Sequence, residues 1–306
     1  MSAAEARLLA LDWGTSSARA YWLGAEGVVL DQSEAPLGVQ KVSDGDFASA
    51  LSRICRSRRS DLPVIACGMI GSRQGWVEAP YLDCPADFDA IAAALTPVPG
   101  TPVQIVPGLL CRDAEGVPDV MRGEETKIVG TLEQGLAQRG VVLMPGTHSK
   151  WALVAAGAVQ SFMSFMTGEI YAVLREHSIL GRLATANGGT PDDGSFARGV
   201  RHSLRQGAAL THDVFSARTL ALTGELAPGG ISDYLSGLLI GAELGAARTW
   251  LAANEAQALA VTLLGDDALV SRYSAALRLA GIDASVGPET AAARGLWRIA
   301  RHARLV

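Results

Sequence analysis

Short apolar segments joined by glycine-rich turns fill the first third of the chain. Alternation of small or polar with bulky side chains in the opening segments predicts a meander of three strands with tight turns. Later apolar runs predict buried strands, and helical spacing of apolar residues predicts helices between them. The strands are expected at 7–12, 18–23, 27–33, 62–72 (ending in a glycine-rich loop) and 103–109, and the helices at 46–58 and 87–95.

The opening pattern returns in the middle of the chain, where a strand, a Gly-Thr turn and two further strands follow one another over residues 141–165. An offset of 132 residues superimposes the two turns. Because the strand-turn-strand context is shared as well, we interpret this as an internal duplication of one fold unit. Identical residues fall at Gly14 and Gly146, Thr15 and Thr147, Ser17 and Ser149, and Ala20 and Ala152.

The rest of the chain is predominantly helical in its apolar spacing, with a short buried strand at 258–265. Glycines recur at every fourth position within residues 231–251, as in some membrane helices. Asp233 and Glu243 in the same segment argue against a membrane span, so we expect close helix packing there instead. The sequence therefore predicts an α/β protein, with helices after residue 120 and at 170–183, 194–206, 214–222, 231–251, 267–281 and 289–306.

Composition and charge narrow the function classes. The formal net charge is -5 and the sequence pI is about 5.6, without a long basic block, which argues against nucleic-acid binding. No apolar run reaches the ~18 residues of a membrane span, and the first residues lack a signal-peptide pattern. The four cysteines lack metal-site spacing and suit a reducing compartment. We therefore expect a cytoplasmic protein; a homodimer is one option for its oligomeric state, which the sequence leaves open.

The turn at residues 12–19 places a carboxylate, Asp12, beside a Gly-Thr-Ser-Ser sequence. Because this glycine turn opens a strand, it is neither a P-loop nor a dinucleotide fingerprint. Small residues let backbone N–H groups and hydroxyls approach phosphate, and a carboxylate there could hold Mg²⁺ beside it. An ordinary acidic hairpin turn is the alternative.

The second turn, at residues 146–150, has the same Gly-Thr-x-Ser sequence without an acid, since Met144 stands where the first turn has Asp12. One turn with a carboxylate and one without would suit two lobes that hold a Mg-nucleotide. His148 and Lys150 add charge-assisted phosphate contacts, although a solvated strand residue is the alternative for Lys150.

Six motifs spread over nearly the whole chain resemble the 2-dehydro-3-deoxygalactonokinase family: LDWGTSSARAYWL, CGMIGSRQGW, MRGEET, MPGTHSKWALV, FMTGEIYAVL and LLGDDALVSRYSAAL. The resemblance implies an α/β, two-lobe, duplicated fold of the actin/hexokinase (ribonuclease H-like) class with an interlobe cleft. It implies an N-terminal lobe at 1–121 and a C-terminal lobe at 122–306, with the helix at 289–306 returning to the first lobe.

The resemblance also implies a reaction. It is the transfer of phosphate from ATP, with Mg²⁺, to the 6-hydroxyl of 2-dehydro-3-deoxy-D-galactonate, giving the 6-phosphate and ADP in galactose and galactonate catabolism. A kinase for another sugar acid, such as 2-dehydro-3-deoxygluconate, is an alternative. A phosphoanhydride hydrolase and a sugar-sensing protein on the same superfold are the others.

The catalytic base does not follow directly from the resemblance, because related kinases use an Asp where this chain has Glu124 and Glu125. One of these is expected to be the base or to lie beside the metal; ordinary helix N-terminal charges are the alternative. The expected site residues fall into four groups. They are Asp12, Glu124 and Glu125 for catalysis, with Asp12 at the metal; Gly14, Thr15, Ser16, Ser17, Arg19, Gly146, Thr147, His148, Ser149 and Lys150 for phosphate; Gly265 and Asp266 for adenosine; and Arg73 (for the carboxylate), Gln74, Trp76, Thr167 and Glu169 for substrate.

Overall fold

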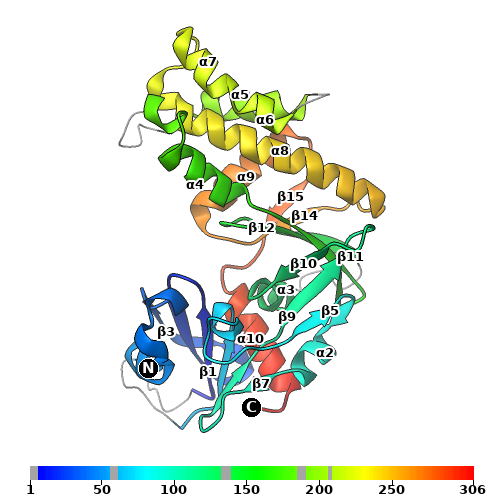
Figure 1. The fold of residues 1–306 in the computed structure, drawn as a ribbon. Coiled ribbons are helices and arrows are strands. Elements are labelled where there is room, and N and C mark those ends of the chain that lie inside the picture. The colour runs from blue at the N-terminus through cyan, green and yellow to red at the C-terminus, as the bar shows by residue number, and fades with distance from the viewer. Residues whose placement is uncertain (1–5, 56–60, 132–138, 185–190, 206–208) are drawn as a thin grey trace. The chain divides into compact units, whose positions relative to one another are not determined.

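The computed structural model describes residues 6–55, 61–131, 139–184, 191–205 and 209–306 (Figure 1). Parts of the predicted helices at 46–58 and 194–206, and of the loop and helix at 120–139, lie outside these residues. Backbone contacts divide the chain into two compact units. Unit 1 comprises Met1–Arg139, Ala152–Phe162 and Gly287–Val306, and unit 2 comprises Gly140–Trp151 and Met163–Val286. This division differs from the lobe boundary expected after residue 121, which stays a prediction.

The first sheet of unit 1 contains the predicted opening meander. Its strands lie in the order β3-β2-β1-β4-β8-β7, with β1, β2 and β3 antiparallel and with β4 and β8 parallel to β1 and to each other. Nearly every residue of β1 is buried, so its apolar run packs on both faces. The bounds are β1 Leu8–Trp13, β2 Ala18–Leu23, β3 Val29–Ala35, β4 Val64–Cys67, β7 Thr96–Pro97 and β8 Val103–Ile105.

A second, three-stranded sheet of unit 1, in the order β10-β9-β5, was not predicted as a sheet; the strand expected at 103–109 reaches only the first two residues of β9. Its strands are short and carry exposed positions, so their hydrophobic pattern is weak. Unit 1 also contains the antiparallel pair of β6 with β13. The bounds are β5 Tyr81–Asp83, β6 Ala86–Asp87, β9 Gly108–Arg112, β10 Pro118–Met121, β13 Ala158–Phe165, α1 Phe47–Ile54 and α2 Phe88–Ala93.

Helix α3 (Glu124–Thr131) packs closely against helix α10 (Ala291–His302) within unit 1, as Figure 1 also shows. A Cβ atom on Gly130 would lie 2.0 Å from the Ala291 carbonyl oxygen, and one on Gly295 would lie 1.9 Å from the Thr126 carbonyl oxygen. The two glycines therefore let the helix backbones touch. This contact fixes the segment that carries Glu124 and Glu125.

Unit 2 combines a sheet with a group of helices. Its strands β15, β14, β11 and the start of β12 are neighbours in that order in a six-stranded sheet, with β14 parallel to both β11 and β15. The strands are β11 Arg139–Met144, β12 Ser149–Ala155, β14 Val261–Leu263 and β15 Ala284–Val286. The helices are α4 Thr167–His177, α5 Asp193–Leu204, α6 Leu210–Asp213, α7 Ser216–Leu222, α8 Ile231–Ala253 and α9 Asp267–Leu279.

The long helix α8 lies along α5 in the helical part of unit 2 (Figure 1). A Cβ atom on Gly237 would lie 2.1 Å from the Phe196 carbonyl oxygen, and Gly241 also faces α5, whereas Gly245 has no neighbour within 4 Å. Close packing is thus confirmed at two of the three predicted glycines. Among the residues that the structure describes, no helix has the length and apolar character needed to cross a membrane.

Candidate functional site

The turn between β1 and β2 is held tightly by the chain around it. Its hydrogen bond runs from the Gly14 N–H to the Ser17 carbonyl oxygen, at 2.9 Å, and leaves Thr15 and Ser16 exposed at the tip. The N–H of Val39 donates to the Gly14 carbonyl oxygen at 3.0 Å. These bonds hold the backbone of the turn in place, with the small residues Thr15 and Ser16 facing solvent. Arg19, also expected at phosphate, is exposed on β2 and pairs with Glu34 at 3.2 Å.

Asp12 is the second-last residue of β1, and its carboxylate meets groups from two other segments of unit 1. The Lys127 Nζ atom lies 4.0 Å from Asp12 Oδ2, and the Cys67 thiol donates weakly to Oδ1 at 3.9 Å. Attraction to Asp12 raises the pKa of Lys127, against the effect of burial, and Glu124 adds to the rise. Asp12, Glu124 and Lys127 are all partly exposed. We call these three residues the carboxylate–lysine cluster, because both carboxylates raise the pKa of Lys127.

Sequence reasoning missed Lys127, although its place three residues after Glu124 on a helix was a signal, because such spacing puts both on one face. Among the described residues, no three His, Cys, Asp or Glu side chains are arranged to hold a metal ion.

Glu125 and Glu124 differ sharply in environment. Glu125 is fully buried; its Oε2 accepts from the Gly123 N–H at 2.7 Å and its Oε1 from the Thr126 hydroxyl at 3.0 Å. Burial, reinforced by repulsion from Glu124, raises the pKa of Glu125 to about 8. Glu124 is partly exposed, and its Oε2 accepts from the Arg122 N–H at 3.0 Å. Only Glu124 of the pair offers a carboxylate to solvent.

In the loop at residues 71–76, two of the residues expected to bind substrate, Arg73 and Trp76, have other partners in the structure. The Arg73 side chain is 87% exposed and pairs with Glu78 at 3.6 Å. Trp76 stacks on Phe47, with ring centroids 6.0 Å apart, so its ring belongs to the edge of the core. Gln74 is exposed.

The turn before β12 in unit 2 is held by the start of α4. The His148 Nε2 and Glu169 Oε2 atoms are 2.5 Å apart, and the Glu169 N–H donates to the Thr147 carbonyl oxygen at 3.0 Å. A Cβ atom on Gly168 would lie 2.4 Å from the Gly146 carbonyl oxygen, so only glycine permits this approach. Thr147 and His148 are exposed, whereas Glu169 is directed to His148.

The last two residues of this motif point inward. Ser149 is fully buried and its hydroxyl lies 2.8 Å from the Tyr273 hydroxyl, and Lys150 is also buried. Tyr273 donates in turn to Glu243 Oε2 at 2.7 Å. Glu243 also accepts from the Trp151 Nε1–H at 2.9 Å and from the Thr167 hydroxyl. We call Ser149, Tyr273, Glu243, Trp151 and Thr167 the Glu243 network; Tyr273 and Trp151 were not singled out from the sequence.

The expected adenosine segment follows β14. Gly265 and Asp266 are exposed, and the Leu264 N–H donates to the Leu143 carbonyl oxygen at 2.9 Å, which places the segment beside the end of β11. Asp266 caps α9, because its Oδ1 accepts from the Leu269 N–H at 3.0 Å. The structure thus brings Gly265 near the second turn, and gives the Asp266 side chain a capping contact.

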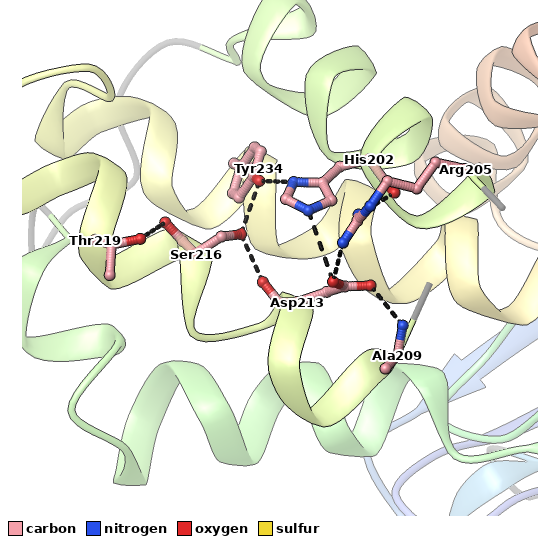
Figure 2. A network of polar contacts seen from close by, with 7 residues as sticks. All are labelled: His202, Arg205, Ala209, Asp213, Ser216, Thr219 and Tyr234. Atoms are coloured by element: carbon pink, nitrogen blue, oxygen red, sulfur yellow. Dashed lines mark hydrogen bonds and ion pairs between the residues drawn. The ribbon is translucent and has the colours of Figure 1, made fainter. Parts of the chain in front are cut away.

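A further polar network joins the helices α5 to α8 of unit 2 (Figure 2). Asp213 is buried, accepts from the Arg205 guanidinium, and accepts from the Ala209 N–H at 3.0 Å. His202 Nδ1 lies 2.5 Å from the Tyr234 hydroxyl, which also lies 2.8 Å from Ser216 Oγ. Arg205, Asp213 and Thr167 line a cavity of about 710 Å³. These polar groups bond to one another, as expected of a structural network that holds the helices α5 to α8 together.

Comparison with known proteins identifies the family. Residues 12–299 match the family described as 2-keto-3-deoxy-galactonokinase. The chain is 35% identical over 297 residues to the 2-dehydro-3-deoxygalactonokinase of Escherichia coli (strain K12), covering 96% of this chain and 98% of that protein. A candidate 2-dehydro-3-deoxygalactonokinase from Sinorhizobium meliloti, known from its crystal structure, has a TM-score of 0.88 at 35% identity, covering 96% of this chain and 98% of that one.

A more distant likeness concerns the fold alone. The activator of the 2-hydroxyisocaproyl-CoA dehydratase from Clostridium difficile has a TM-score of 0.52 at 11% identity, covering 96% of this chain and 95% of that one. The predicted α/β fold of actin and hexokinase type is confirmed. The resemblance in the six motifs is confirmed as well, and the chain belongs to the 2-keto-3-deoxy-galactonokinase family of kinases.

Proposed function

We propose that this kinase transfers the γ-phosphate of ATP to the 6-hydroxyl of 2-dehydro-3-deoxy-D-galactonate, giving the 6-phosphate and ADP. The names of its relatives support this substrate. The observation that carries the chemistry is the carboxylate–lysine cluster of Asp12, Glu124 and Lys127 next to the exposed Thr15 and Ser16. Because ATP is the donor, we place the activity in the cytoplasm.

Asp12 is the proposed magnesium residue. Mg²⁺ is usually bound through one or two carboxylates together with substrate phosphate oxygens, so a single partly exposed Asp fits its needs. When bound, the ion would neutralise phosphate charge. Lys127 would add positive charge from the protein side, and the hydroxyls and N–H groups of Thr15 and Ser16 would donate to phosphate oxygens.

Glu124 is the proposed base. A base must reach the substrate hydroxyl, and the Glu124 carboxylate is partly exposed, whereas both Glu125 oxygens are buried and already accept hydrogen bonds. Glu125 instead accepts a hydrogen bond from the Gly123 N–H and so fixes the backbone next to Glu124. The proposal thus favours Glu124 over Glu125, a choice that the sequence leaves open.

The exposed turn of unit 2 is proposed to hold the nucleotide phosphates through Gly146, Thr147 and His148. Glu169 would act by orienting His148 rather than by touching the sugar acid. Gly265 and the backbone at Asp266 would face the nucleoside. Ser149 and Lys150, which are buried, would support this turn from within unit 2.

An ADP-release assay with a panel of sugar acids tests the proposal. We expect Mg²⁺-dependent turnover with 2-dehydro-3-deoxygalactonate, slower turnover with 2-dehydro-3-deoxygluconate, and none without a sugar acid. ADP release without any acceptor would indicate a hydrolase instead. Absence of turnover together with a ligand-dependent rise in melting temperature would indicate a sensor.

Variants of the two glutamates test the assignment of the base. Glu124→Gln should lower kcat by about 100-fold or more, as is typical for loss of a general base. Glu125→Gln should retain most of kcat, and Glu115→Gln, on an exposed loop, serves as the matched control. A large loss in Glu125→Gln with a near-normal Glu124→Gln would reverse the assignment.

A further inference from the structure

Arg122 carries a buried positive charge in unit 1. Its side chain is only 8% exposed; Nη2 donates to the Ala79 carbonyl oxygen at 2.8 Å, and the Tyr81 ring covers the guanidinium at 4.2 Å. The Nε and Nη1 atoms are buried without a hydrogen-bond partner. Within the described part of the chain, no carboxylate side chain forms an ion pair with this guanidinium. Burial of a cation with unmatched donors is costly.

A third unmatched donor belongs to the start of the loop 71–76, whose backbone lies against Arg122. A Cβ atom on Gly71 would lie 3.0 Å from Arg122 Nη1, so this nitrogen points at the backbone of the loop. The hydroxyl of the next residue, Ser72, is also buried without a partner. Buried polar groups are rarely left unmatched, and an unmatched group calls for a water, an ion or a ligand.

We infer that Arg122 and Ser72 bind the carboxylate of the sugar acid, an inference that rests on the proposed function. A guanidinium offers two parallel N–H donors to a carboxylate, and the Ser72 hydroxyl supplies a third. Arg73, which the sequence favoured for this role, is 87% exposed and already paired with Glu78. An exposed ion pair contributes little and would discriminate weakly between an acid and a neutral sugar.

Binding requires a local movement, because the Arg122 Nε and Nη1 atoms are covered. The Tyr81 side chain is the natural element to move, since this residue is 41% exposed and therefore borders solvent. The loop is anchored at both sides by backbone hydrogen bonds from Trp76 to Ile70, at 2.8 Å, and from Ala79 to Gly71, at 2.9 Å. A turn of the Tyr81 ring would uncover the face of the guanidinium that it covers, while these bonds hold the loop.

The experiment compares two substrates in each variant. One is 2-dehydro-3-deoxygalactonate, and the other is its analogue with the carboxylate replaced by a hydroxymethyl group. The ratio of their kcat/KM values is measured in the wild type, Arg122→Gln, Arg122→Lys, Ser72→Ala and the control Arg73→Gln. Because both values come from one preparation, a loss of folded protein cancels from the ratio.

We expect the ratio to fall by about 100-fold in Arg122→Gln and about 5-fold in Ser72→Ala, in line with lost charged and neutral hydrogen bonds. Arg122→Lys should fall in between, because it keeps the charge but loses the paired donors, and Arg73→Gln should match the wild type. An unchanged ratio in the Arg122 variants, or a fall in Arg73→Gln of the size expected for Arg122→Gln, overturns the inference. If no Arg122 variant is soluble, an unchanged ratio in Ser72→Ala overturns it.

Failure of the proposed function has a different signature, since the wild type would then turn over neither substrate. In that case, saturation-transfer NMR with the same acid and its neutral analogue replaces the ratio. Binding of the acid that Ser72→Ala weakens, with the neutral analogue unaffected, supports the inference. Equal binding of both compounds to the wild type overturns it.

Discussion

Tyr273 donates its hydroxyl proton to the buried carboxylate of Glu243 over 2.7 Å, which leaves the Tyr273 oxygen free to accept from Ser149 at 2.8 Å. The Trp151 indole and the Thr167 hydroxyl donate to the same carboxylate. One acid thus joins strand β12, the first residue of α4 and helix α9. These contacts direct the Ser149 hydroxyl into the interior of unit 2. They thereby support the exposed turn at Gly146, Thr147 and His148, which directly precedes Ser149 in the chain.

Replacement of Glu243 by Gln should destabilise the protein and loosen the second turn. An amide offers one acceptor oxygen, so at least one of three buried donors loses its partner, at a cost of about 1–3 kcal/mol. We expect a lower urea midpoint and a KM for ATP raised by about 5-fold or more, with kcat changed less, as for lost binding of substrate. Glu255→Gln, at an exposed position after α8, is the control. Wild-type stability and KM in Glu243→Gln would contradict this role.

Glu125 should make stability fall as the pH rises. Its carboxyl has a pKa of about 8 in the folded protein against 4.5 as the ordinary value, chiefly because of burial. Below pH 4.5 both states hold this proton. As the pH rises from 4.5 to about 8 only the unfolded state loses it, so the stability of the folded state falls over this interval and then levels off. The shift corresponds to at most about 5 kcal/mol.

The measurement is urea unfolding of the wild type and Glu125→Gln at pH 5, 7 and 9. The wild type should lose more stability over this interval than Glu125→Gln, in which the neutral side chain removes the titration. Glu124→Gln should lie between them, because repulsion from Glu124 contributes to the pKa of Glu125. Parallel pH dependences of the wild type and Glu125→Gln would exclude this account.

Lys127 should be needed to balance the charge of Asp12 and Glu124. Lys127→Met leaves two partly exposed carboxylates facing phosphate without a nearby cation, so we expect kcat/KM for ATP to fall by about 10-fold or more, equivalent to at least about 1.4 kcal/mol. Lys127→Arg should recover part of the loss. Lys41→Met, which removes an exposed lysine outside the cluster, should match the wild type. Full activity in Lys127→Met would remove this residue from the site.

The sequence predicted the strands and helices whose hydrophobic pattern is strong. The opening meander, β14, α8 and α9 were expected within a few residues, because burial on one or both faces leaves a periodic signal. The sheet of β10, β9 and β5 was missed as a unit, since strands of three to five residues with exposed positions carry almost no period.

For the candidate site, the sequence likewise does not show which side chains are buried or which groups they pair with. Spacing indicated the two glycine turns and the Glu124–Glu125 pair, but it could not say which glutamate is buried. That difference depends on how α3 packs in the folded chain, where it contacts α10 from a segment about 160 residues further along. The partners of Arg73 and Arg122 likewise depend on tertiary packing.

Two glycines of helix α8 should respond in opposite ways to alanine. Gly237 faces α5, and its Cβ atom would lie 2.1 Å from the Phe196 carbonyl oxygen, so Gly237→Ala forces the helices apart at a cost of about 1–3 kcal/mol. Gly245 has open space around it, so Gly245→Ala should stabilise the helix by about 0.5–1 kcal/mol. Thermal unfolding should show a lower Tm for the first variant and a higher one for the second. Equal shifts in the same direction would mean that helix propensity, and not the contact with α5, decides the effect at both positions.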